Sequence, residues 1–189
     1  MKTTLAIDTA TARTQFAVLK GSELLWLQTE DGATTHGDVL AKFGAIAAKE
    51  NIDQVIVGMG PGPFTGLRTG IVFAKAFAFA RGLPVHGVCS LDAIAYGIEL
   101  TELIVATDAR RKELYWARYV DGKRVGEPKV SAPSEIPNLP IFGEGASKYV
   151  LTSDTEHLYP KLIAFPDLAH VNEPMYLRHP DAVPTADRK

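Results

Sequence analysis

The sequence has a single cysteine, Cys89, among its 189 residues. No disulfide can therefore form within the chain, and a reducing cytoplasm is the expected compartment. Long apolar runs are also missing, because the longest one, residues 71–80, is interrupted by Lys75 and is too short to cross a bilayer. The first residues lack a basic segment followed by an apolar core, so no signal peptide is expected. These absences predict a soluble cytoplasmic protein that makes no membrane contact.

The residue patterns of common enzyme classes are missing as well. The five histidines occur at positions 36, 86, 157, 170 and 179, and none has a second histidine three or four residues away. This spacing argues against a metal-binding histidine pair on one helix face. A metal site of the His-x-x-x-His type beginning at His36 would need a second histidine at position 40, where this chain has Leu40. His36 is therefore expected to start a helix. No Gly-x-Ser-x-Gly motif is present and Cys89 has no obvious base partner. We therefore predict no catalytic residue and no bound metal in this chain.

An excess of positive charge is missing too, since the formal net charge is −2. Broad attraction to nucleic acid is not expected, and any RNA contact would have to be local or shared with a partner. The one dense basic segment is Asp108-Ala109-Arg110-Arg111-Lys112, which is predicted to form a hairpin turn. The side chains of Arg110, Arg111 and Lys112 are either solvated or in contact with phosphate groups, and the sequence does not decide between these two interpretations.

Two similar strand patterns indicate two related lobes. Residues 5–10 read LAIDTA and residues 104–109 read IVATDA, and in each an apolar strand closes on an aspartate. In the first half we expect a hairpin at residues 20–22, followed by a helix over 36–50 that is capped by Thr34 or Thr35. A strand-helix-strand unit comes next. A last helix is expected over 91–99, with Ser90 as its cap. A short helix is expected near 148–151 in the second half. We predict an α/β fold with mixed sheets, comprising a lobe over 1–100, a smaller lobe over 101–178 and a flexible tail over 179–189.

The glycine-rich segment GMGPGPFTGLRTG, residues 58–70, resembles a phosphate-binding loop only superficially. A Walker A alignment places Pro61 at the first glycine and Leu67 at the lysine, so that pattern fails. The dinucleotide pattern Gly-x-Gly-x-x-Gly fails as well. Thr65 is expected to cap the following helix, whose first amides could attract an anion. A structural turn is the other interpretation.

The helix expected over residues 66–81 is apolar on nearly every face. Gly66, Gly70, Ala74 and Ala78 recur every fourth residue, so one ridge carries almost no side chain. Glycine inside a helix costs up to about 1 kcal/mol relative to alanine, which requires a packing reason. A helix of this kind must be covered all round. We expect the bare ridge to pack against a partner subunit; cover by the neighbouring helix over 36–50 is the alternative.

Several segments together resemble the bacterial TsaB family, also called YeaZ. They are LAIDTAT, GPGPFTGLRTGIVFAKAFA, GVCSLDAIA, DARRKELYWARY and EPMYLR, and they occur in this order over residues 1–178. The resemblance implies the two-lobed actin/Hsp70/sugar-kinase-like (ASKHA) fold, here with a reduced second lobe. It also implies a non-catalytic subunit that pairs with the catalytic paralogue TsaD and works beside the ATPase TsaE. That complex transfers a threonylcarbamoyl group to the adenosine next to the anticodon of tRNAs that read A-starting codons.

The resemblance also implies where the partner binds, because in this family the two first-lobe helices form the interface. The residues expected there are Val39, Leu40, Phe43, Gly66, Arg68, Gly70, Ala74, Phe77 and Ala78. A homodimer through the same surface is expected when the chain is alone, and contact with tRNA is expected to be indirect. Candidate nucleotide or anion contacts are Asp8, Thr9, Thr65 and Asp108, although aspartates at strand ends also cap turns.

Two alternative functions stay open at this stage. A nucleotide-binding ATPase of the ASKHA type would need a better phosphate loop than DTATART, residues 8–14, which has no glycine. No cofactor is therefore predicted beyond weakly held or interface-shared ATP or ADP. A hydrolase like the M22 metallopeptidases would need the histidine pair that the sequence does not offer.

Overall fold

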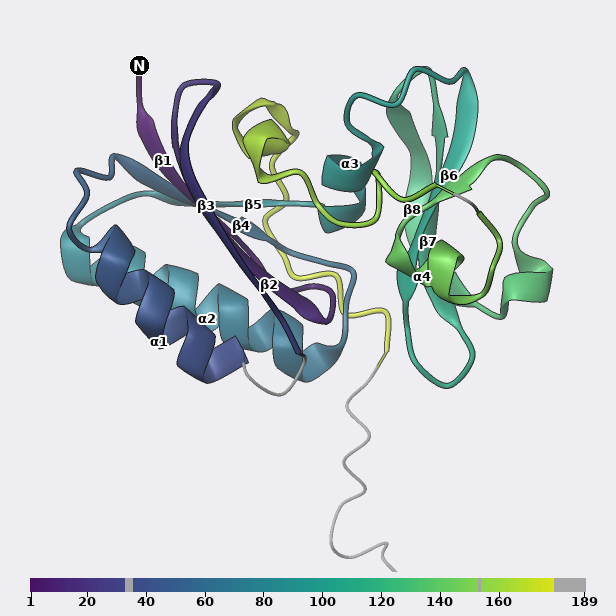
Figure 1. Cartoon of the computed structure of the whole chain (residues 1–189), viewed down its shortest axis with the longest axis horizontal. Coiled ribbons are helices and arrows are strands. Elements are labelled where there is room, and N and C mark those ends of the chain that lie inside the picture. The colour runs from purple at the N-terminus through teal and green to yellow at the C-terminus, as the bar shows by residue number, and fades with distance from the viewer. Residues whose placement is uncertain (33–35, 153, 179–189) are drawn as a thin grey trace, which may run out of the picture.

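The first half of the chain forms a five-stranded mixed sheet with the order β3-β2-β1-β4-β5. The computed structural model describes residues 1–32, 36–152 and 154–178 (Figure 1). The capping predicted for Thr34 or Thr35 and the tail predicted over 179–189 therefore lie outside the described residues. The strands of this first sheet are β1 (Thr3–Asp8), β2 (Arg13–Lys20), β3 (Glu23–Asp31), β4 (Gln54–Gly58) and β5 (Val85–Val88).

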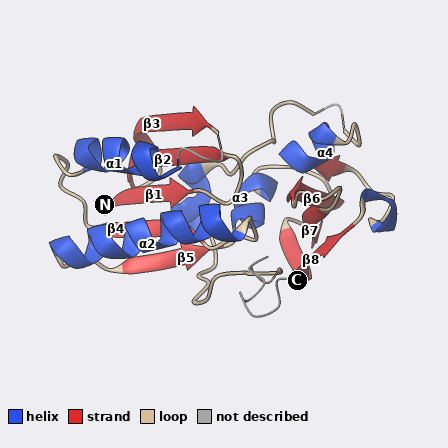
Figure 2. Ribbon diagram, turned by 90° about the horizontal axis from the view of Figure 1, so that it is seen from below, coloured by secondary structure: helices blue, strands red, loops and turns tan. Residues whose placement is uncertain are grey.

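The inner strands of the first sheet are covered on both faces, whereas the edge strand β3 is largely exposed. Helices α1 (His36–Ala47) and α2 (Phe64–Arg81) lie side by side on one face, and the 3-10 helix η2 (Leu162–Asp167) covers the other (Figures 1 and 2). The apolar residues of β1 alternate accordingly, since Leu5 and Ile7 pack under the helices while Ala6 joins the core beneath η2. A strand buried on both faces reads as a continuous apolar run, as this one does.

The second half repeats this topology with fewer elements. Its sheet has the order β8-β7-β6-β9, formed by β6 (Glu102–Asp108), β7 (Leu114–Val120), β8 (Lys123–Ser131) and β9 (Ile141–Phe142). In each half an antiparallel meander is followed by a strand parallel to the first one, β4 beside β1 and β9 beside β6. The predicted α/β architecture with two mixed sheets is confirmed. The second lobe is smaller because only η1 (Pro133–Glu135) stands where the first lobe has α1, and α4 (Glu144–Lys148) is short.

The two lobes are joined through α3 (Ser90–Ala95), whose two sides face different sheets. Leu91 and Ile94 pack on the second sheet, while Ala93 belongs to the core of the first. The predicted helix over 91–99 is therefore shorter than expected. The cap predicted for Ser90 is wrong, because the helix begins at Ser90 itself and follows Cys89 without a side-chain cap.

After the second sheet the chain crosses back to the first one. The amide of Val171 donates to the Gly87 carbonyl at 2.8 Å, and the amide of Met175 donates to the Met59 carbonyl at 2.8 Å. The extent of the second lobe, residues 101–178, stays a prediction about domains. The contacts nevertheless place the C-terminal part of that range against the first sheet.

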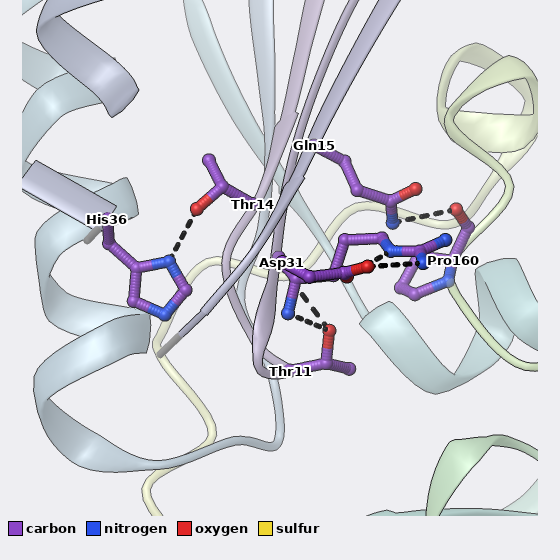
Figure 3. Close-up of polar contacts among 7 residues, drawn as sticks. Thr11, Thr14, Gln15, Asp31, His36 and Pro160 are labelled. Atoms are coloured by element: carbon purple, nitrogen blue, oxygen red, sulfur yellow. Dashed lines mark hydrogen bonds and ion pairs between the residues drawn. The ribbon is translucent and has the colours of Figure 1, made fainter. Parts of the chain in front are cut away.

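Polar contacts fix this returning segment to β2 (Figure 3). The Gln15 side-chain amide donates to the Pro160 carbonyl at 3.1 Å. Arg13 forms two hydrogen bonds with Asp31, at 2.7 and 3.0 Å, and its guanidinium lies 3.8 Å from the centre of the Tyr159 ring. The segment is thereby held across the outer strands of the first sheet.

Candidate functional site

The glycine-rich loop after β4 packs directly on the loop after β1. A Cβ atom added to Gly58 would lie 1.9 Å from Oδ2 of Asp8, and one added to Gly62 would lie 2.4 Å from the carbonyl oxygen of Ala10. Only glycine allows two backbone segments to approach this closely. Of the two interpretations of this loop, the structure favours a structural turn that closes the first lobe at the carboxyl ends of β1 and β4.

Asp8 is buried at the centre of this contact. Its carboxylate accepts hydrogen bonds from Oγ of Ser90 at 2.6 Å and from the Ala10 amide at 2.9 Å. Burial raises the pKa of Asp8 from its ordinary value of 3.8 to about 6, against the opposing effect of these two hydrogen bonds. Its lone pairs are directed at groups of this chain, as expected for a turn-capping aspartate.

Replacing Asp8 by asparagine is expected to stabilise the protein at pH 7. Because the folded-state pKa is raised, the charged form is disfavoured on folding, and stability is lost as the pH rises from 3.8 through about 6. The neutral amide can accept from the Ala10 amide and donate to Ser90. The expected gain for Asp8→Asn is about 3 kcal/mol at pH 7, falling to nearly zero at pH 4. Urea unfolding at both pH values measures it, and equal effects at the two would contradict the assignment.

Thr9 and His36 fix the positions of α2 and α1, respectively, on the first sheet. Oγ1 of Thr9 donates to the Gly66 carbonyl at 2.8 Å. Nδ1 of His36, the first residue of α1, lies 2.5 Å from Oγ1 of Thr14 (Figure 3). Burial lowers the pKa of His36, and the positive charge of Arg110 lowers it further. Both residues hold elements of the first lobe together, as expected for a helix-starting histidine.

Thr65 does not cap α2. The helix begins at Phe64 after Pro63, which makes no side-chain capping bond, and Thr65 lies inside the first turn. The backbone of Pro63 already has the extended conformation of a capping residue, and its carbonyl accepts the first helical bond from Leu67 at 3.0 Å. The carbonyl of Thr65 instead accepts from Oγ1 of Thr69 at 2.7 Å.

The bare ridge of α2 faces the interior of this chain. The four small residues are all buried, and a Cβ added to Gly70 would lie 2.1 Å from Oγ1 of Thr9. The expectation that the ridge packs on a partner subunit is wrong, because the close neighbour it accommodates is the loop after β1 and the chain's own sheet. The predicted contacts that the structure buries inside the first lobe are Val39, Leu40, Phe43, Gly66, Gly70, Ala74 and Ala78.

Two predicted interface residues differ from this group. Arg68 is exposed in the second turn of α2, and Phe77 is half-buried beside Phe73. Phe73 fills the space over Gly44 of α1, where an added Cβ would lie 2.4 Å from its ring. The alternative prediction, in which α1 covers α2, therefore holds for the side of α2 that carries Phe73.

The sides of α1 and α2 that face away from the sheet form an exposed, largely apolar surface, called the outer face here. Phe79 is 90% exposed and Val72 is 55% exposed. The sequence analysis missed both, although their spacing with Ala76 marks one helical stripe opposite the bare ridge. The outer face consists of Ala41, Ala45, Val72, Ala76, Phe79 and Ala80, with Lys42, Lys75 and Arg81 at its rim.

Asp108, the counterpart of Asp8 in the second lobe, is paired within this chain. Nζ of Lys148 lies 2.6 Å from its Oδ2, and its amide donates to the Glu144 carboxylate at 2.9 Å. The described residues contain no group of three or more histidine, cysteine, aspartate or glutamate side chains arranged to hold a metal. Within the same residues, no helix is long and apolar enough to cross a membrane.

A family model described as TsaD, tRNA N6-adenosine threonylcarbamoyltransferase, matches residues 39–171 of this chain. An uncharacterised protein of Mycobacterium tuberculosis is 40% identical over 205 residues, which cover 98% of this chain and 96% of that protein. The tRNA threonylcarbamoyladenosine biosynthesis protein TsaB of Escherichia coli is 33% identical over 133 residues, covering 61% of this chain and 54% of that protein.

Solved structures agree with these sequence matches. The chain is similar to YeaZ from Pseudomonas aeruginosa, with a TM-score of 0.69 and 26% identity over 89% of this chain and 90% of that one. A second structure, of an uncharacterised protein with similarity to peptidase YeaZ from the same species, gives a TM-score of 0.72 over 94% of this chain and 100% of that one. The fold is thus the two-lobed ASKHA-like one that the resemblance implied. The chain belongs to the TsaB (YeaZ) family, within the wider group that the TsaD family model describes.

Proposed function

We propose that this chain is a non-catalytic subunit in the biosynthesis of tRNA threonylcarbamoyladenosine, which pairs through its outer face with a catalytic TsaD-like paralogue. The observation that carries the pairing is the exposure of Phe79 and Val72 among alanines on two adjacent helices. An apolar surface of this kind, rimmed by lysine and arginine, is typical of a protein interface. The relatives named TsaB support the pathway.

A scaffold role is supported by the groups at the carboxyl ends of the strands. In an ATPase of this fold, the strand-end aspartate would need to be available to a metal-bound nucleotide. Here Asp8 accepts two hydrogen bonds from this chain, and Gly58 packs so closely on it that an added Cβ would lie 1.9 Å from its Oδ2. In the absence of the paralogue, the outer face is expected to form a homodimer, and a TsaE-like ATPase is the proposed third component in the cytoplasm.

Reconstitution of tRNA modification tests the proposal. The TsaD-like and TsaE-like proteins of the same organism, a threonylcarbamoyl adenylate source and a tRNA that reads an A-starting codon are combined with and without this chain. Threonylcarbamoyladenosine is expected only when the chain is present. Full activity of the other two proteins without it would overturn the proposed function. ATP titration of the isolated chain addresses the alternative, since micromolar affinity that Asp8→Asn removes would favour an ATPase.

A further inference from the structure

Strand β3 forms an unprotected edge of the first sheet (Figure 2). It is nine residues long, and among the described residues it pairs only with β2. Alternate amides and carbonyls along β3 therefore point away from the sheet without a strand partner. Natural edge strands are usually short, covered, or protected by lysine or proline, and β3 contains neither of these residues. This edge is available to a further strand.

Two leucines are uncovered along this edge. The ladder between β2 and β3 skips Leu25, so Leu24 and Leu27 both face the side of the sheet that η2 covers. Their partners on β2, Leu19 and Ala17, belong to the core beneath η2. Leu24 and Leu27 are themselves 42% and 44% exposed, so the apolar core continues to the edge of the sheet without a cover there.

An open cavity of about 510 Å³ lies beside these leucines. The returning segment lines it with Tyr159, Leu162 and Ile163, and β2 lines it with Arg13 and Gln15. Its volume is in the range of sites that bind small molecules or groups of side chains. The free edge of β3 thus runs along a cavity that can receive side chains from an added strand.

Exposed carboxylates flank the same edge. Glu23 and Glu30 lie near the two ends of β3, and Glu156 lines the cavity. All three are exposed, and none forms an ion pair within the part of the chain that the structure describes. Of the two cations that line the cavity, Arg13 is already paired with the last residue of β3, which leaves Lys161. A segment with basic residues at its ends would complement this surface.

We propose that the edge of β3 and the adjoining cavity bind an extended segment of a partner protein, which adds to the first sheet as a further strand. Backbone hydrogen bonds with β3 hold the segment. Its alternate apolar side chains enter the cavity beside Leu24 and Leu27, and lysine or arginine at its ends meets the glutamates. The cavity lies on the opposite face of the sheet from α1 and α2, so it stays open when the outer face is occupied (Figure 1). The inference goes beyond the proposed function and does not depend on it.

Two other occupants fit this edge less well. In the antiparallel registers that pair nearly the whole of β3 with β3 of a second copy, Glu23 comes opposite Glu30 or Asp31. Like charges directly opposite each other destabilise a pair of strands. The chain's own residues 179–189 contain two prolines, which cannot donate to a strand ladder, and Val183 is their largest aliphatic residue.

Selection from a random peptide library tests the inference. Peptides long enough to span β3 are displayed on phage and selected against the wild-type chain, and the recovered ones are synthesised. They are expected to share alternating apolar residues with lysine or arginine near an end. The variant Leu24→Lys with Leu27→Lys should bind them at least about tenfold more weakly by fluorescence anisotropy, because the apolar wall is lost. Peptide binding to the wild type should slow amide hydrogen exchange in residues 23–31.

The matched control is Leu100→Lys with Val125→Lys, which changes side chains that are 41% and 49% exposed elsewhere on the chain. It should bind the peptides like the wild type. If selection yields no shared pattern, or if the Leu24/Leu27 variant binds the peptides like the wild type, the inference is wrong. Peptides that bind without slowing exchange in β3 would be cavity ligands rather than added strands, and they would also contradict it.

A second variant, Glu23→Gln with Glu30→Gln, leaves the apolar wall intact and tests the charges. It should bind the basic peptides several-fold more weakly, and an unchanged affinity would contradict the charge complementarity. Sedimentation equilibrium of the chain with Val72→Glu and Phe79→Glu, whose outer face is blocked, is expected to show a monomer. A dimer that Leu24→Lys with Leu27→Lys dissolves would place a second copy on β3 and overturn the inference. Since these measurements need no TsaD-like paralogue, their failure leaves the proposed function standing.

Discussion

Under the proposed function, a chain with glutamate at positions 72 and 79 is expected not to pair with a TsaD-like paralogue. Phe79 and Val72 are the largest exposed apolar side chains on α2, so the partner would bury both. Truncating a large apolar side chain at the centre of an interface typically costs about 2 kcal/mol or more, and an uncompensated carboxylate adds to that cost. We expect Val72→Glu with Phe79→Glu to weaken pairing by at least about a thousandfold, measured by isothermal titration calorimetry.

The same double variant should fold normally, because neither side chain contributes to the core of the free chain. The control is Leu25→Glu with Val125→Glu, which changes apolar side chains that are 44% and 49% exposed on other surfaces. That control should pair with wild-type affinity. The assignment of the outer face as the pairing surface would be wrong if the 72/79 variant bound the partner like the wild type. It would also be wrong if both double variants lost binding equally.

The fold was accessible from the sequence because its signals are local. The hairpin at Lys20-Gly21-Ser22 and the strand pattern repeated near residue 104 both correspond to observed elements. Periodicity also located α1 and α2 to within a few residues, although α1 ends at Ala47 and α2 begins at Phe64. Each of these features depends on residues that are neighbours in the sequence.

Features that depend on distant residues were not accessible in this way. Ser90 has the residue type of a helix cap, but its hydroxyl donates to Asp8, which lies 82 positions away in the sequence. The return of the C-terminal segment to β5 depends on backbone bonds such as that from Val171 to Gly87. The short helix expected near 148–151 is α4, which begins four residues earlier, at Glu144. The Glu144 side chain accepts a hydrogen bond from the amide of Asp108 at the end of β6, a contact between residues far apart in the sequence.

The bare ridge of α2 shows how a correct local observation led to a wrong partner. Small residues every fourth position do indicate that another backbone comes close. The pattern does not identify that backbone, which is the loop carrying Thr9 rather than a second subunit. The exposed stripe of Val72, Ala76 and Phe79 lies on the opposite side of the same helix, and its large side chains gave it the appearance of a core face in the sequence.

Replacing Gly70 by alanine is accordingly expected to destabilise the chain rather than to affect pairing alone. The added Cβ would lie 2.1 Å from Oγ1 of Thr9, which is 1% exposed and donates to the Gly66 carbonyl. Relief requires Thr9 to turn away and to give up this buried hydrogen bond, at a cost of about 1–3 kcal/mol. Overpacking adds about 1–3 kcal/mol, whereas the better helix propensity of alanine returns about 1 kcal/mol. The expected loss is therefore about 1–5 kcal/mol in the free energy of unfolding, measured by urea unfolding.

Gly37 in the first turn of α1 provides the matched control, since a Cβ added there would meet nothing within 4 Å. Gly37→Ala should leave stability unchanged or raise it by up to about 1 kcal/mol, because only the helix propensity changes. The two substitutions are chemically identical and both lie in first-lobe helices, so their difference isolates the contact with Thr9. If Gly70→Ala were as stable as Gly37→Ala and only partner binding fell, the ridge would face the partner after all, and the buried packing of α2 against the loop after β1 would be refuted.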